Sequence, residues 1–194
     1  MCIEIENYNQ HDFYNYFNYN QIDADAEALL NTLLNNPDYN LHLNKRRVPV
    51  MEIAKVLGFN IYTTRFNDYN IKATIGISKQ LIDKYKSDKV IILSNEYTDE
   101  EILFSLCCEL AHYIYDSNTD NEYSHTYRIY DIELRAIRFA DALLMPLTSF
   151  KEAYIELSHN INDKELLIHA LSDTFNVPQV AVKRRLKQVK NTKA

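Results

Sequence analysis

The chain has 194 residues, of which 46% are hydrophobic and 25% charged, a balance that predicts one soluble globular domain with its own core. No apolar run approaches the roughly 20 residues that a membrane span needs, and no basic and then apolar leader opens the chain, so we expect a cytoplasmic protein without a membrane partner. The formal net charge of −6 argues against a broadly basic nucleic-acid-binding protein. The three cysteines form no spaced disulfide framework, which is typical of a reducing compartment.

Helical patterns follow an irregular start. Residues 1–21 mix Tyr, Phe and Asn without a steady period, and we interpret them as an appendage. Apolar residues at helical intervals predict an amphipathic helix over 22–34, which ends before Pro37. A second, short helix is expected after Pro49. It closes at Gly58, because glycine readily adopts the left-handed conformation that ends many helices.

Three short segments rich in β-branched and aromatic residues come next, at 59–66, 70–78 and 89–94. Polar, turn-prone stretches separate them. We therefore expect three strands of one small sheet.

Two long helices are predicted after the strands. Thr98 and Glu101 have the spacing of a capping box, which indicates the start of a helix that runs to about Tyr115. Its expected apolar stripe consists of Leu103, Leu106, Leu110 and Ile114. A further helix is expected over 129–145 and stops at Pro146.

The C-terminal region predicts two more helices within 163–189, with Pro178 opening the second. Six basic residues gather here: Lys183, Arg184, Arg185, Lys187, Lys190 and Lys193. The pair resembles a helix-turn-helix, so contact with DNA through 183–193 is one interpretation. Basic charge that complements the dipole at a helix C-terminus is the interpretation that we favour.

Residues 108–112 read Cys-Glu-Leu-Ala-His, which matches the motif His-Glu-x-x-His except at its first position. In that motif the residues at i and i+4 lie on one helix face and hold one zinc ion, while the intervening Glu is the general base. By position, Cys108 takes the first ligand place, Glu109 the place of the base and His112 the second ligand place. A thiolate can bind zinc. A cysteine in an apolar helix is also often a small buried residue, which is how we interpret Cys107.

The order of these features, with Phe-Ala-x-x-Leu-Leu-Met-Pro at 139–146, resembles the ImmA/IrrE metallopeptidase family over about residues 22–189. The resemblance implies a third zinc ligand at Glu133, and a role in clipping repressors, or acting beside them, in mobile-element and stress circuits. Two positions depart from the family pattern, since Cys108 replaces a histidine and Ile137 replaces an asparagine. Both changes weaken a metal site, because they remove a ligand type and a polar neighbour that would orient a ligand.

We therefore expect an α+β fold: a zincin-like metallopeptidase domain over 22–150, with helices around a small three-stranded sheet, and a helical C-terminal extension over 151–194. His125, Tyr127 and Tyr130 fall between the motif helices. One of them could donate a hydrogen bond to a reaction intermediate, but we interpret them as loop residues.

The leading functional hypothesis is a zinc metallopeptidase-like protein that acts on a protein partner, such as a repressor or a toxin–antitoxin component. Its expected site residues are Glu109 as the catalytic base, with His112, Glu133 and Cys108 as the zinc ligands. Because of the altered motif, we predict little or no peptidase activity. The alternative is a non-catalytic regulatory module that keeps the fold and binds protein or DNA.

Overall fold

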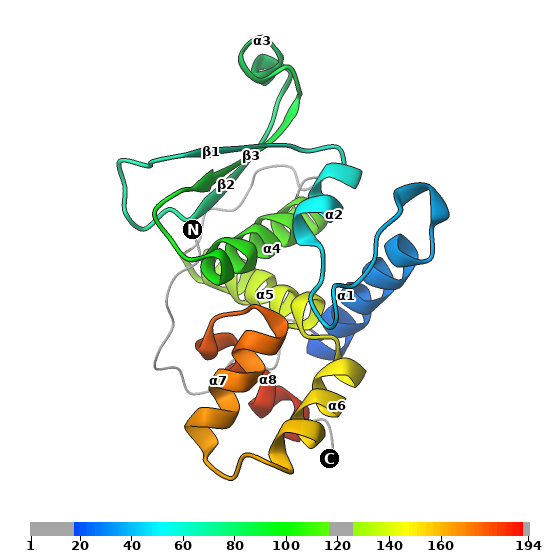
Figure 1. The fold of residues 1–194 in the computed structure, drawn as a ribbon. Coiled ribbons are helices and arrows are strands. Elements are labelled where there is room, and N and C mark those ends of the chain that lie inside the picture. The colour runs from blue at the N-terminus through cyan, green and yellow to red at the C-terminus, as the bar shows by residue number, and fades with distance from the viewer. Residues whose placement is uncertain (1–17, 117–125, 192–194) are drawn as a thin grey trace.

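The computed structural model describes residues 18–116 and 126–191, and its helices surround a small sheet (Figure 1). The first elements along the chain are α1 (Tyr19–Leu34), η1 (Pro37–Tyr39), α2 (Val50–Val56), β1 (Asn60–Thr64), β2 (Ala73–Ile77), η2 (Lys79–Leu81), α3 (Ile82–Tyr85) and β3 (Lys89–Ser94). The later ones are α4 (Asp99–Asp116), α5 (Thr126–Leu144), α6 (Leu147–Ser158), α7 (Lys164–Phe175) and α8 (Gln179–Asn191). The predicted α+β class is confirmed. Most of the expected appendage, residues 1–17, lies outside the described residues.

Helix α1 belongs to the core. It begins at Tyr19 rather than at Ile22, because the Asn18 side chain accepts a hydrogen bond from the Gln21 N–H and so caps the helix. Its buried positions recur every three or four residues, at Ile22, Ala26, Leu30 and Leu33. This stripe packs on α5.

The three expected strands are confirmed. β3 is the central strand, with β1 parallel to it on one side and β2 antiparallel on the other. In this register Ile61 and Ile75 both lie beside Ile91, and the three side chains pack toward the core. β2 is therefore an edge strand, and it also contacts α4.

Helix α4 runs between the sheet and α5 (Figure 1). Its start is the predicted capping box, in which the Glu101 N–H donates to Thr98 Oγ1 at 3.4 Å and the Thr98 N–H donates to Glu101 Oε2 at 3.2 Å. The predicted apolar stripe is confirmed in part. Leu106 and Leu110 are fully buried and Leu103 packs against the core, but Ile114 is 38% exposed and residues 104–111 are all buried, whichever way they face. The cause is packing, because α4 is contacted by four elements: α5, β2, β3 and α2.

The two C-terminal helices are confirmed. Asn176 ends α7 in the left-handed conformation, with φ 55°, and α8 follows after Pro178. Phe175, Ala181 and Val182 belong to the same hydrophobic core as α4 and α5. The expected domain boundary at residue 150 falls within α6, a helix that we did not predict. Within 18–116 and 126–191, no helix is long and apolar enough to cross a membrane.

Candidate metal centre

Helices α4 and α5 bring His112 and Glu133 together. His112 lies in the last turns of α4 and Glu133 in the first half of α5, and the two helices are in extensive contact. Nε2 of His112 is 3.3 Å from Oε1 of Glu133, with 17% and 10% of the respective side chains exposed. One nitrogen donor and one oxygen donor therefore meet at a shielded point between the helices. We call the surroundings of this point, with Glu109 and Cys108, the candidate metal centre.

A carboxylate that we did not predict holds the ring of His112. Asp116, one turn later on α4, places Oδ2 3.1 Å from Nδ1 of His112. Arg135 of α5 donates a hydrogen bond to the other oxygen of Asp116. A carboxylate on one ring nitrogen, with the other nitrogen left for the ligand, commonly orients metal-binding histidines. The i, i+4 spacing of His112 and Asp116 is the sequence signal that could have found this residue.

The neighbouring carboxylates favour a protonated His112. Burial alone would lower the pKa of the imidazole, but the hydrogen bond with Asp116 and the adjacent carboxylate of Glu133 outweigh burial and raise the pKa to about 9. Burial would likewise raise the pKa of Asp116, yet its bonds with His112 and Arg135 lower it. The metal-free centre is therefore an imidazolium between two carboxyl groups at neutral pH.

Glu109, the expected base, is buried and only 6% exposed. Burial raises the pKa of its carboxyl group, although a hydrogen bond from the backbone of Ile75 in β2 and the charge of His112 oppose the rise. The edge strand β2 thus borders the candidate metal centre. A buried carboxyl group with a raised pKa is the kind of group that can take up a proton near neutral pH.

Cys108, the expected first ligand, is fully buried in the core. No three His, Cys, Asp or Glu side chains among residues 18–116 and 126–191 form a group that could hold a metal ion. The role of Cys108 as a zinc ligand therefore stays a prediction, while His112 and Glu133 are the predicted ligands that meet. A catalytic zinc site uses three protein ligands.

The two remaining donors have suitable geometry for zinc. A tetrahedral zinc ion with bonds of about 2.1 Å holds its ligand atoms about 3.4 Å apart, close to the 3.3 Å between Nε2 of His112 and Oε1 of Glu133. Oε2 of Glu133 is buried and has no hydrogen-bond partner among the described residues. Two donors therefore meet at this point, one fewer than the three protein ligands of a catalytic zinc site.

Other sequence predictions concern α5 and the segment before it. Ile137 is 8% exposed and belongs to the core, where it offers no polar group to a ligand. The loop interpretation is wrong for Tyr127 and Tyr130, because α5 already begins at Thr126. Their side chains, and the whole of His125, lie outside the described residues.

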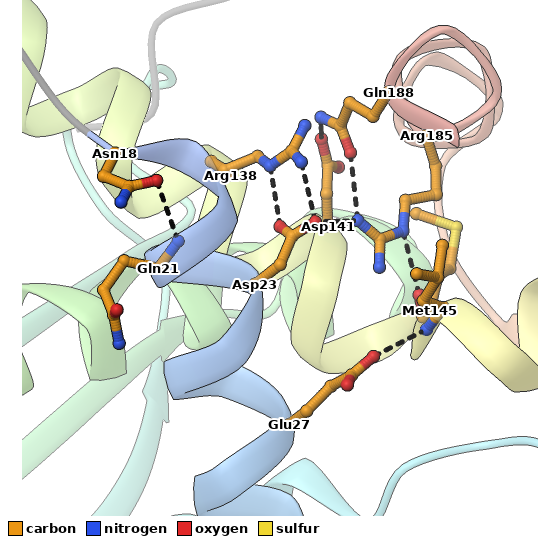
Figure 2. A network of polar contacts seen from close by, with 10 residues as sticks. Asn18, Gln21, Asp23, Glu27, Arg138, Asp141, Met145, Arg185 and Gln188 are labelled. Carbon is orange, nitrogen blue, oxygen red and sulfur yellow. Dashed lines mark hydrogen bonds and ion pairs between the residues drawn. The ribbon is translucent and has the colours of Figure 1, made fainter. Parts of the chain in front are cut away.

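The basic C-terminal helix forms internal ion pairs. Arg184 donates to both carboxylate oxygens of Asp141, at 2.9 and 3.0 Å. Arg185 is fully buried and donates to the Met145 carbonyl at 3.0 Å and to Asp23 at 3.1 Å (Figure 2). These two arginines are therefore engaged within the protein. The side chain of Lys190 and all of Lys193 lie outside the described residues.

An α+β scaffold with a glutamate and a histidine on one helix facing a glutamate on the next defines a metallopeptidase-like protein. Residues 54–187 match the peptidase M78 family, described as the IrrE N-terminal-like domain. The match covers more than half of the chain, so the chain belongs to this family, and the resemblance inferred from the sequence is confirmed.

The fold is also found in a solved structure of a Mycobacterium tuberculosis transcriptional regulator. The two chains share 18% sequence identity with a TM-score of 0.61, over 90% of this chain and 49% of the regulator. This chain thus spans about half the length of the regulator, and at this identity the likeness concerns the fold alone. Among curated proteins, none matches the chain in sequence.

Proposed function

We propose that this chain is a regulatory protein on a metallopeptidase fold, which engages a protein partner such as a repressor or a toxin–antitoxin component without zinc-dependent peptide hydrolysis. The observation that carries the proposal is that His112 and Glu133 meet without a third donor in a metal-binding group among the described residues, and that cysteine stands where the motif has its first histidine. A role in transcription is supported by family membership and by the regulator with the similar fold.

The chemistry of peptide hydrolysis explains why an incomplete donor set matters. A hydrolytic zinc ion lowers the pKa of a bound water, and it needs three protein ligands and one open position. Among residues 18–116 and 126–191, no three such donors form a group that could hold a metal ion, which supports the proposal. We expect Glu109 to have no polarised water from which to take a proton. The raised pKa of His112 also favours its protonated ring, which would have to lose a proton before Nε2 could bind a metal.

The direct test is to incubate the purified chain with a candidate repressor, and to do the same with the Glu109→Gln variant. We expect both proteins to bind the repressor and neither to cleave it. Cleavage by the natural protein that is lost in Glu109→Gln would overturn the proposal and establish a peptidase. Failure of both proteins to bind that repressor would contradict the proposed partner.

DNA contact is the competing function, and the internal ion pairs of Arg184 and Arg185 count against it. Lys183 pairs with Glu165 at 3.1 Å, and Lys187 is an exposed basic residue on the described part of α8. Salt-dependent binding of duplex DNA, weakened by Lys187→Ala, would favour the competing function.

A further inference from the structure

A pocket of about 450 Å³ lies where the chain between α1 and α2 meets the C-terminal helices. We call it the 40–49 pocket, after the segment that forms much of its wall; α2, α4, α5 and α7 supply the rest. Its volume is within the range of about 300–1,000 Å³ that is usual for small-molecule sites. In Figure 1 the segment passes from α1 to α2 beside the lower helices.

The 40–49 pocket is separate from the candidate metal centre. Leu103 lines the pocket and precedes His112 by nine residues on α4, which is about 13 Å along a helix. Leu144 lines it at the end of α5, about 16 Å along that helix from Glu133. A ligand in the pocket would therefore leave the centre free and still touch both helices that carry it.

Two arginines fix the segment that walls the pocket. Arg46 forms an ion pair with Glu156 of α6 at 2.9 Å. Arg47 donates from Nη2 to the Asp173 carbonyl of α7 at 2.7 Å. Arg47 and Asn44 also exchange backbone hydrogen bonds, at 3.0 and 3.1 Å. The wall is thus held to two helices and needs little ordering when a ligand binds.

The lining combines an apolar floor with charges of both signs. Leu144 and Phe175 are 2% and 1% exposed and form the floor with the partly buried Leu103. Arg47 and Glu52 are exposed and stand at the rim. A guanidinium has five N–H donors and matches a carboxylate in geometry, while a carboxylate accepts hydrogen bonds from an ammonium group.

We propose that the 40–49 pocket binds a small zwitterion with an apolar side chain, namely a free amino acid or a dipeptide. Arg47 receives its carboxylate, Glu52 its ammonium group, and the floor its side chain. A ligand of one charge would satisfy only one rim residue, so both charges contribute to selectivity. Because the rim is exposed, each charge contributes modestly, and we expect a dissociation constant of about 1 mM or somewhat below. The inference does not depend on the proposed function.

The test is isothermal titration calorimetry of the full chain with L-leucine, L-phenylalanine and glycyl-leucine. We expect at least one of these three zwitterions to bind. Two analogues each keep one charge of leucine: 4-methylpentanoate keeps the carboxylate and 3-methylbutylamine keeps the ammonium group. We expect both to bind at least about threefold more weakly than the zwitterion that binds best. Glu52→Gln should weaken zwitterion binding about threefold or more, and Arg47→Met, which also removes the hydrogen bond to the Asp173 carbonyl, at least as much. Arg65→Met is the matched control, since Arg65 pairs with Glu96 at the surface and does not line the pocket.

Two results would overturn the inference. The first is that none of the three zwitterions binds at about 10 mM, ten times the expected dissociation constant. The second is that binding is the same in Glu52→Gln and Arg47→Met as in the natural protein. Glu52 is exposed on α2, so Glu52→Gln should fold. If Arg47→Met does not fold, Glu52→Gln alone still tests the inference. Repressor cleavage and zinc content do not enter this test, so its failure is distinguishable from failure of the proposed function.

Discussion

Both ring nitrogens of His112 have a carboxylate oxygen within 3.3 Å, from Asp116 on its own helix and from Glu133 on α5. The position of Glu109 and the pairing of His112 with Glu133 could be predicted, because helical spacing and the family resemblance fix which helix faces meet. The complete burial of Cys108 could not, since it depends on which elements pack around α4. Arg135 also escaped prediction, because its partner Asp116 lies on another helix.

The protonation of His112 gives a pH prediction for the metal-free protein. Its pKa in the fold is about 9, above the ordinary 6.5, so the folded state holds this proton more tightly than the unfolded state. The stabilisation is fully present below pH 6.5 and is lost as the pH rises through about 9. We expect the free energy of unfolding to fall by about 1–3 kcal/mol across this range.

Urea unfolding of chelator-treated protein between pH 6 and 9.5 measures this loss. The decrease in the free energy of unfolding with rising pH should be much smaller in His112→Gln than in the natural protein. His169→Gln is the matched control, because His169 also pairs with an acid four residues later but is 61% exposed. An equal slope in His112→Gln and in the natural protein would show that another group is responsible.

At the scale of elements, local patterns identified the strands, the capping box and the α7–α8 turn, since each depends on residues close in sequence. The burial of α4 on several sides could not be seen, because it depends on which elements pack around the helix. α6 was missed for a different reason. The sequence indicates Pro146 only as the end of α5, although it also occupies the N-cap of α6.

The capping box gives an element-scale prediction. Thr98→Ala should lower the free energy of unfolding by about 1 kcal/mol, because it leaves the Glu101 N–H at the start of α4 without its side-chain acceptor. Thermal or urea unfolding measures the change. Thr148→Ala, at an exposed position in α6, should change stability much less. Equal losses in the two variants would mean that the cap contributes nothing specific.

At the scale of the whole molecule, an ion network joins α1, α5 and α8 (Figure 2). Asp23 accepts from Arg138 and Arg185, which lie 115 and 162 residues further along the chain. The sequence showed a basic cluster and could not reveal these distant acids, so DNA contact stayed open as an interpretation. In the fold, the network joins α8 to the helix that carries Glu133.

The network predicts a large effect for one substitution. Asp141 is fully buried and accepts from Arg184 and Gln188. Asp141→Asn should lower the free energy of unfolding by about 3–5 kcal/mol, because it leaves partly buried positive charge without its partner. Glu165→Gln removes the exposed pair with Lys183 and should cost less than about 1 kcal/mol. Similar losses in both variants, measured by urea unfolding, would contradict the structural role of the network.

The most direct test of the account is the zinc content of the natural protein, Cys108→Ser and Cys108→His. Each is loaded with zinc, dialysed and measured by elemental analysis, with thermal unfolding as a check that the larger histidine is accepted in the core. We predict well under one zinc ion per chain for the natural protein and Cys108→Ser, and about one for Cys108→His, since histidine restores the third ligand. One zinc ion per chain in the natural protein, lost in Cys108→Ser, would establish Cys108 as a ligand and contradict the account.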